Sequence, residues 1–234
     1  MEIINNNYMK TFEELKEELL NRAKNANACQ NGYKMGLDAK NKADLLKAIT
    51  ANWFWVLRDA RIVDAIYLEE NFTEEELSEA GIYTRKCHEV RTVSFACGSA
   101  TVEAYGSATV KAYGSATVKA CDSATVEACG SATVEAYDSA TVEAYGSATV
   151  EACGSATVEA YGSATVKAYG SATVKAYDSA TVKAYDSATV EACDESYVED
   201  CTGNIRPRYD YAIVKDYHNH KIYIRKGKFE IIEV

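Results

Sequence analysis

The chain has 234 residues and carries 35 acidic against 25 basic side chains, a net charge of −10. Such a charge repels nucleic-acid phosphates, so direct nucleic-acid binding is not expected. No run approaches the about 18 consecutive apolar residues of a membrane span, and residues 1–7 lack the basic and apolar segments of a secretory leader. We therefore expect a cytoplasmic protein without membrane contact and with reduced cysteines.

The first ninety residues carry the signals of helices. Thr11 with Glu14 forms a capping box, which predicts a helix over 11–25. The polar, glycine-containing stretch over 26–37 predicts a loop. At the end of this segment the apolar spacing changes from the helical period to alternation. The sequence therefore predicts a small helical N-terminal cap over 1–90.

Three further helices are predicted in this cap. Apolar spacing predicts a helix over 41–57, in which Trp53 and Trp55 are expected to belong to the core. An exposed aromatic anchor for a partner is the alternative for the two tryptophans. A third helix is predicted over 63–72, and a second capping box predicts a short fourth helix within 73–81.

Residues 99–194 consist of one eight-residue unit that repeats twelve times without a gap. This octad reads Ser-Ala-Thr-Val-(Glu/Lys)-Ala-(Tyr/Cys)-(Gly/Asp), and its positions are numbered 1 to 8. A period of eight does not fit a helix, and Thr, Val and Tyr favour strands. In a strand, the alanines and the valine at positions 2, 4 and 6 share one face, which we expect to be buried.

One octad cannot bury its apolar face alone, so stacked coils are expected, in a parallel β-solenoid over 91–202. Two octads per coil suit the thin alanine and valine core; three octads are the alternative. A 24-residue coil would place Cys97 over Cys121 and Cys129 over Cys153, whereas a 16-residue coil makes no two repeat cysteines neighbours in a column. Position 8 is expected to form the turn, Gly through a positive φ and Asp by bonding its own backbone.

After the last octad the repeat decays into a basic, tyrosine- and isoleucine-rich tail. Alternation predicts strands over 209–216, 220–225 and 228–233, with residues 225–228 as a hairpin turn. We therefore predict a short β-hairpin-like C-terminal cap over 203–234. The expected fold class is mainly β, a parallel β-solenoid between a helical cap and a β-rich cap.

The layout combines a helical N-terminus that ends in Gly81-Ile82-Tyr83, Ala-Thr-Val-Glu-Ala-Tyr-Gly octads and a short strand-rich tail. In these features it resembles octapeptide-repeat β-solenoid hypothetical proteins of gut bacteria and their phages. That group carries no assigned activity. The resemblance therefore implies a fold and assigns no functional residues.

Motifs for catalysis or metal binding are sparse. His218-Asn219-His220 places two imidazoles two residues apart without a third ligand nearby, and is expected to be a turn. Cys87 and His88 are adjacent, so on a strand they would point apart and not form a nucleophilic pair. We predict no cofactor, no metal and no enzymatic activity. An enzyme with a pocket in the N-terminal helical domain, or at its joint with the first coil, is the alternative.

The charge of the repeat provides the clearest candidate for a binding surface. Between Lys119 and Lys167 there is no basic residue, and a 16-residue coil would arrange the acidic residues as a belt around the middle of the rod. A basic protein partner would be attracted there; a solvated surface made uneven by tandem duplication is the alternative interpretation. The predicted acidic belt consists of Asp122, Glu127, Glu135, Asp138, Glu143, Glu151 and Glu159.

We therefore expect a non-enzymatic structural or interaction protein that presents a rigid, acidic, repetitive surface to a protein partner. A phage or mobile-element inhibitor that mimics the charge of DNA, and so occupies a host DNA-binding or defence protein, is one alternative. Homo-oligomerisation is left open. Regular Ser and Thr columns also suit ice binding, but Glu or Lys at position 5 shares that face and argues against it.

Overall fold

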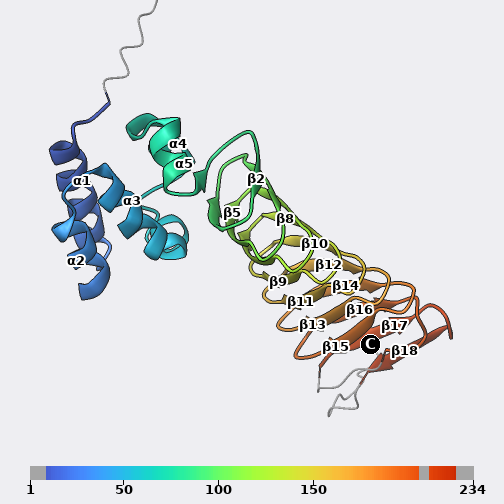
Figure 1. The fold of residues 1–234 in the computed structure, drawn as a ribbon. Helices are drawn as coiled ribbons and strands as arrows, with labels where there is room; N and C mark the ends of the chain where they lie inside the picture. The colour runs from blue at the N-terminus through green and yellow to red at the C-terminus, as the bar shows by residue number, and fades with distance from the viewer. Residues whose placement is uncertain (1–8, 206–210, 225–234) are drawn as a thin grey trace, which may run out of the picture.

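The computed structural model describes residues 9–205 and 211–224. It contains a helical region followed by a rod of stacked β-coils, and the helices lie at one end of the rod (Figure 1). The mainly β, solenoid fold that the octads predict is confirmed. Of the predicted C-terminal elements, the strand over 228–233 and the turn over 225–228 lie outside the described residues.

The helical region is built from short helices that begin at side-chain caps. Both predicted capping boxes form, at Thr11 and at Thr73, where each hydroxyl accepts a hydrogen bond from the backbone of the glutamate three residues on. Trp53 is buried as predicted, and Trp55 packs partly buried against the same core. The helices are α1 (Phe12–Asn25), α2 (Gln30–Asp38), α3 (Lys42–Ala51), α4 (Ala65–Asn71) and α5 (Glu74–Glu79), with a π-helical turn at Trp55–Asp59 between α3 and α4.

The predicted loop over 26–37 is wrong, because most of it forms α2. Two glycines lower the helix propensity of this segment and suggested a loop. In the fold they allow close packing: a Cβ at Gly36 would lie 3.3 Å from Leu20 Cδ2, and one at Gly32 would lie 3.1 Å from Asn52 Oδ1. The tertiary contacts of α2 with α1 and α3 therefore compensate for its weak propensity.

The second predicted helix, over 41–57, is also shorter than expected. Helix α3 ends at Ala51, and the chain continues through a π-helical turn in which the Ala60 N–H donates to the Trp55 carbonyl oxygen. The wider turn keeps both Val56 and Leu57 buried in the helical core.

The rod consists of two parallel sheets, and each coil contributes one strand to each sheet. Thr149 pairs with Thr165 and Val150 with Val166, a shift of two octads, so the coil contains two octads and the 24-residue alternative is excluded. Sheet A contains β1 (Ile82–Tyr83), β3 (Val93–Ala96), β5 (Thr109–Gly114), β7 (Thr125–Gly130), β9 (Thr141–Ala144), β11 (Thr157–Ala160), β13 (Thr173–Ala176) and β15 (Thr189–Ala192).

Sheet B is longer and ends in the only antiparallel pair of the described strands. In it β17 and β18 form a hairpin whose turn spans 217–220, so the predicted turn at His218-Asn219-His220 is confirmed. Sheet B contains β2 (Cys87–Val90), β4 (Thr101–Ala104), β6 (Thr117–Ala120), β8 (Thr133–Ala136), β10 (Thr149–Ala152), β12 (Thr165–Ala168), β14 (Thr181–Ala184), β16 (Tyr197–Asp200), β17 (Ile213–Asp216) and β18 (Lys221–Ile224).

The core of the rod contains almost only alanine and valine. Positions 2, 4 and 6 of the octads are buried as predicted, and this core runs continuously from Val90 to Val214. The helical region covers the first coil, since Phe95 and Cys97 belong to the helical core and the rings of Trp53 and Phe95 lie 5.2 Å apart. The helices therefore form the predicted cap over the open end of the sheets.

The turns at position 8 hold a left-handed backbone, with φ between 50° and 75° for both Gly and Asp. The prediction that Asp bonds its own turn is wrong. Each repeat Asp accepts a hydrogen bond from a backbone N–H one coil earlier, as Asp178 does from Gly162 at 2.8 Å. The carboxylate reaches the neighbouring coil because the turns stack directly, with the same two-octad spacing as the strands.

Candidate interaction surface

The outward surface of the rod consists of side-chain columns that run along its axis. Thr at position 3, Glu or Lys at position 5 and Tyr or Cys at position 7 point outward, because successive side chains of a strand alternate between the two faces. The two-octad register places equal positions over one another. At position 5, sheet A carries Lys111, Glu127, Glu143, Glu159, Lys175 and Glu191 in order, and sheet B carries Glu103, Lys119, Glu135, Glu151, Lys167 and Lys183.

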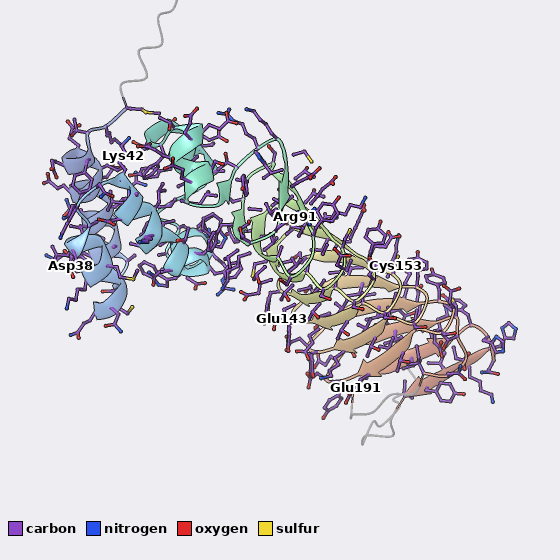
Figure 2. All side chains as sticks on the ribbon, viewed as in Figure 1. Asp38, Lys42, Arg91, Glu143, Cys153 and Glu191 are labelled. Carbon is purple, nitrogen blue, oxygen red and sulfur yellow. The ribbon has the colours of Figure 1, made fainter. Side chains whose placement is uncertain are left out.

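The structure divides the acidic belt between two faces of the rod. Glu127, Glu143 and Glu159 occupy three successive strands of sheet A. Glu135 and Glu151 are neighbours on sheet B. In Figure 2, Glu143 and Cys153, which is two residues after Glu151, lie on opposite sides of the rod.

On sheet A the column of three glutamates is neutralised at its ends. Lys111 Nζ lies 3.2 Å from Glu127, and Lys175 Nζ lies 3.1 Å from Glu159. The middle residue, Glu143, accepts a hydrogen bond of 2.7 Å from the Tyr145 hydroxyl. Like charges on adjacent strands repel, so the centre of this column keeps a net negative charge that no lysine offsets directly.

On sheet B the two glutamates differ in their surroundings. Glu135 is half-buried and accepts a 3.0 Å hydrogen bond from the Tyr137 hydroxyl. Glu151 is exposed, and the residue beside it on the outward face is Cys153 in place of a tyrosine. Within residues 9–205 and 211–224, Glu151 makes no hydrogen bond and no ion pair. It is the belt carboxylate that is most available to a ligand.

The two aspartates of the belt have structural roles in the turns. Gly106 N–H donates to Asp122 at 2.8 Å, and Asp122 N–H donates to Asp138 at 3.3 Å. These bonds hold successive turns together along the edge that follows the sheet B strands. Asp122 and Asp138 therefore add negative charge to the belt, but each uses one carboxylate oxygen within the fold.

The tyrosines at position 7 form a feature that was not predicted from the sequence. On sheet A, Tyr145, Tyr161 and Tyr177 stack with centroid distances of 5.0 and 4.9 Å and nearly parallel rings. On sheet B, Tyr169 stacks on Tyr185 at 5.0 Å. The ring faces therefore point along the rod, and their edges point outward. Only the register could reveal this, since stacked rings are two octads apart in the sequence.

The tyrosine hydroxyls are tied to the acidic columns. Burial and the hydrogen bond to Glu143 raise the pKa of Tyr145 to about 12. The hydrogen bond to Glu135, followed by burial, raises the pKa of Tyr137 to about 12. Both phenols therefore stay neutral donors at physiological pH, and they fix the rotamers of the glutamates they bind.

Three cavities bear on the alternative of an enzyme, two in the helical region and one at its joint with the rod. The largest of the three, about 610 Å³, lies between α3 and α5 and is lined mostly by polar and charged residues, among which Lys42 pairs with Glu76 at 3.6 Å. A cavity of about 50 Å³ between α1, α2 and α3 is lined by aliphatic and aromatic side chains, with Asn52 among the few polar groups.

The cavity at the joint has about 100 Å³. There the His88 ring stacks on Tyr83 at 4.3 Å, and its Nε2 lies 2.9 Å from the Arg85 carbonyl oxygen. These contacts hold His88 as part of the packing.

The potential metal ligands of the described chain are scattered. Among residues 9–205 and 211–224, no three His, Cys, Asp or Glu side chains gather in a way that could hold a metal ion. The eight cysteines all lie within the described ranges and form no disulfide. The helices that the structure describes include none with the length and apolarity needed to cross a membrane.

The chain was compared with protein families, with curated proteins and with solved structures. No protein-family model, no curated protein and no solved structure matches the chain. Any functional statement therefore depends on the geometry and charge described above.

Proposed function

We propose that the protein is a non-enzymatic interaction protein whose solenoid presents the acidic belt to a basic protein partner in the cytoplasm. The observation that carries this proposal is the run of three stacked glutamates on sheet A, with lysines paired only at its two ends. Adjacent like charges destabilise a sheet, and a bound cation would relieve their repulsion. A partner with positive charges thus gains attraction from the belt that a neutral partner lacks.

The rigidity of the rod supports the same proposal. The outward side chains stand on a continuous backbone ladder, and neighbouring coils are also joined by the turn aspartates. Side chains that are fixed before binding lose less entropy when a partner orders them. A repetitive and preorganised surface is therefore suited to an extended or repetitive partner.

The hypothesis of DNA-charge mimicry stays a prediction. Duplex DNA carries about one charge per 1.7 Å of its axis. Each sheet of the belt carries one glutamate per coil, or one per about 4.8 Å. This lower density favours the recognition of individual cationic side chains over imitation of a duplex.

The proposal can be tested with a defined cationic probe. We would titrate hexalysine peptide into the full chain at low salt and follow binding by calorimetry. Glu135→Lys, Glu143→Lys and Glu151→Lys together should weaken binding about tenfold, because they replace acceptors of the belt by cations. They also create a column of five lysines on sheet B, so circular dichroism would be used to check that the variant keeps its fold.

The matched control changes the net charge equally outside the belt. Glu75→Lys, Glu103→Lys and Glu191→Lys should weaken binding only about twofold, through the long-range field alone. Equal losses in the two triple variants would show that binding follows total charge, and the belt would then have no special role.

A further inference from the structure

The tyrosine columns are interrupted where an octad carries Cys in place of Tyr. Cys153 lies between Tyr137 and Tyr169 in the position 7 column of sheet B, because Ala152 pairs with both Ala136 and Ala168. Tyr169 stacks on Tyr185 on its other side. Lys119 lies over the opposite face of Tyr137, with its Nζ 5.6 Å from the ring centroid. The remaining face of each ring is therefore turned toward Cys153.

A ring missing from the column leaves room for a flat group. Two coil steps of about 4.8 Å separate the rings on either side, so a group midway lies about 5 Å from each. This distance is within the range of about 6 Å over which a cation is attracted to an aromatic face. We call the space bounded by Tyr137, Cys153, Tyr169 and Glu151 the Cys153 slot.

Several other interruptions of the columns have a cation of the chain beside them. At Cys129, between Tyr113 and Tyr145, Arg58 of the helical cap donates from Nη1 to the sulfur at 3.9 Å. Cys129 is only 2% exposed. The column of sheet B begins at Tyr105, over which the Arg91 guanidinium lies at 5.5 Å. Arg91 is labelled in Figure 2.

Cations also lie near Cys121 and Cys201, two further interruptions of the sheet B column. At Cys121, the lysine on the same strand is the Lys119 that lies over Tyr137. At Cys201, the neighbouring Glu199 is paired with Lys183 at 2.7 Å, and Lys215 lies 4.5 Å from the Tyr217 centroid. At three tyrosines that have a cysteine as a neighbour in the column, Tyr105, Tyr137 and Tyr217, the chain thus places a cation over the ring.

None of the residues that the structure describes places such a cation at the Cys153 slot. Its strand carries Glu151 at the position where the Cys121 strand carries Lys119. Over the described residues, no lysine or arginine lies against the facing sides of Tyr137 and Tyr169. Lys167 is next to Glu151 on β12, but it is exposed and forms no ion pair with it in the described structure. Burial, followed by the charges of Glu151 and Glu135, raises the pKa of the Cys153 thiol.

We infer that the Cys153 slot receives an arginine side chain of the partner, with its guanidinium between the rings of Tyr137 and Tyr169 and ion-paired to Glu151. This inference rests on the proposed docking of a basic protein and specifies how one residue of that protein is recognised. Arginine is selected over lysine because its flat guanidinium can stack against both rings while its N–H groups bond the carboxylate. Arg58 beside Cys129 shows that a guanidinium can lie at an interruption of the column; there it pairs with Asp59 and lies over the Phe54 ring.

The test compares two peptides of equal charge, hexaarginine and hexalysine, by calorimetric titration into the full chain. The unmodified chain should bind hexaarginine about fivefold more tightly than hexalysine. Cys153→Tyr fills the slot with the residue that eight other octads carry, and it leaves the charge unchanged. This variant should bind the two peptides about equally.

Two further variants define the site. Cys121→Tyr fills the interruption that Lys119 already serves, so the preference for hexaarginine should persist. Glu151→Gln keeps the slot open but removes the ion pair, so it should lower hexaarginine affinity more than hexalysine affinity. Because this substitution is exposed and nearly isosteric, it also serves if Cys153→Tyr fails to fold.

The outcomes separate this inference from the proposed function. We call the chain with Glu135→Lys, Glu143→Lys and Glu151→Lys the belt variant. If it binds more weakly than its charge-matched control while Cys153→Tyr keeps the arginine preference, the inference about the slot is overturned and the docking function stands. An equal loss of preference in Cys121→Tyr and Cys153→Tyr would also overturn the slot. If the belt variant matches its control, the docking function itself fails.

Discussion

The helical region and the solenoid bury apolar side chains in different ways. The helical core depends on large and individual side chains, such as Leu15 of α1, Leu46 of α3, Leu68 of α4 and Phe72, which directly follows α4. The solenoid core contains alanine and valine methyl groups that recur identically in every coil. In the first region each contact is unique, whereas in the second the backbone ladder and its repetition carry the fold. A single lost side chain should therefore matter more in the helices than in the rod.

The largest expected effect is the loss of one aromatic side chain from the helical core. Phe72 is 2% exposed, and Phe72→Ala should lower the free energy of unfolding of the helical region by about 3–5 kcal/mol. The matched change in the rod, Val142→Ala, removes two methyl groups and should cost about 1.5 kcal/mol. Denaturant unfolding would be followed by tryptophan fluorescence, which reports on the helices, and by far-ultraviolet circular dichroism.

The two variants directly test whether the helical core is more sensitive than the solenoid core to the loss of one side chain. A loss in Val142→Ala equal to that in Phe72→Ala would show that the rod is as sensitive to single side chains as the helical core. Loss of both regions in one transition would show that the cap and the rod unfold as a unit.

A smaller effect is expected at the turns, where a backbone conformation and one hydrogen bond are both involved. Asp178 has a φ of 51° and accepts the Gly162 N–H. Asp178→Ala removes the bond and places alanine in a left-handed conformation, so we expect a loss of about 1 kcal/mol. Asp178→Gly removes the same bond, but glycine adopts the left-handed conformation readily. The stability of this variant should therefore be closer to that of the unmodified chain.

The melting temperatures of Asp178→Ala and Asp178→Gly would be compared with that of the unmodified chain. If both variants lose the same stability relative to the unmodified chain, the carboxylate bond dominates and backbone conformation is secondary. Equal stability of both variants and the unmodified chain would mean that the sheets alone determine the turn.

The sequence was sufficient to predict the solenoid because its signal is local and repeated. Alternation within one octad shows which face of the strand is buried and which is exposed. A core of alanine and valine is thin, so it favours two closely apposed strands per coil. Helix α2 was missed for the opposite reason, since Gly32 and Gly36 weaken the local signal and their value appears only against Asn52 and Leu20. The aspartate bonds were assigned to the wrong backbone because the partner lies two octads away in the sequence.

The candidate site was predicted in composition but not in arrangement. The acidic residues were recognised from the absence of lysine and arginine, yet their division between two faces required the register. The cation at Cys129 could not be predicted, since Arg58 lies 71 residues away and reaches it only through the packing of the cap on the rod. Whether a Tyr at position 7 stacks on another ring, or a Cys leaves a ring face open, depends on the neighbours in the column. These neighbours are two octads away in the sequence.

The smallest expected effect concerns the outer surface of the rod, where side-chain bonds add to a ladder that already holds the strands. Because burial and the bond to Glu143 raise the pKa of Tyr145 to about 12, the bond is complete below the ordinary tyrosine pKa. Its contribution to stability should be lost as the pH rises from about 10 through 12. The phenolate absorbance of the unmodified chain minus that of Tyr145→Phe gives the titration curve of this residue. Repeating the same difference measurement in chains that carry Glu143→Gln should shift the titration midpoint of Tyr145 toward 10. An unshifted midpoint would mean that burial alone raises the pKa and that the bond to Glu143 does not stabilise the rod.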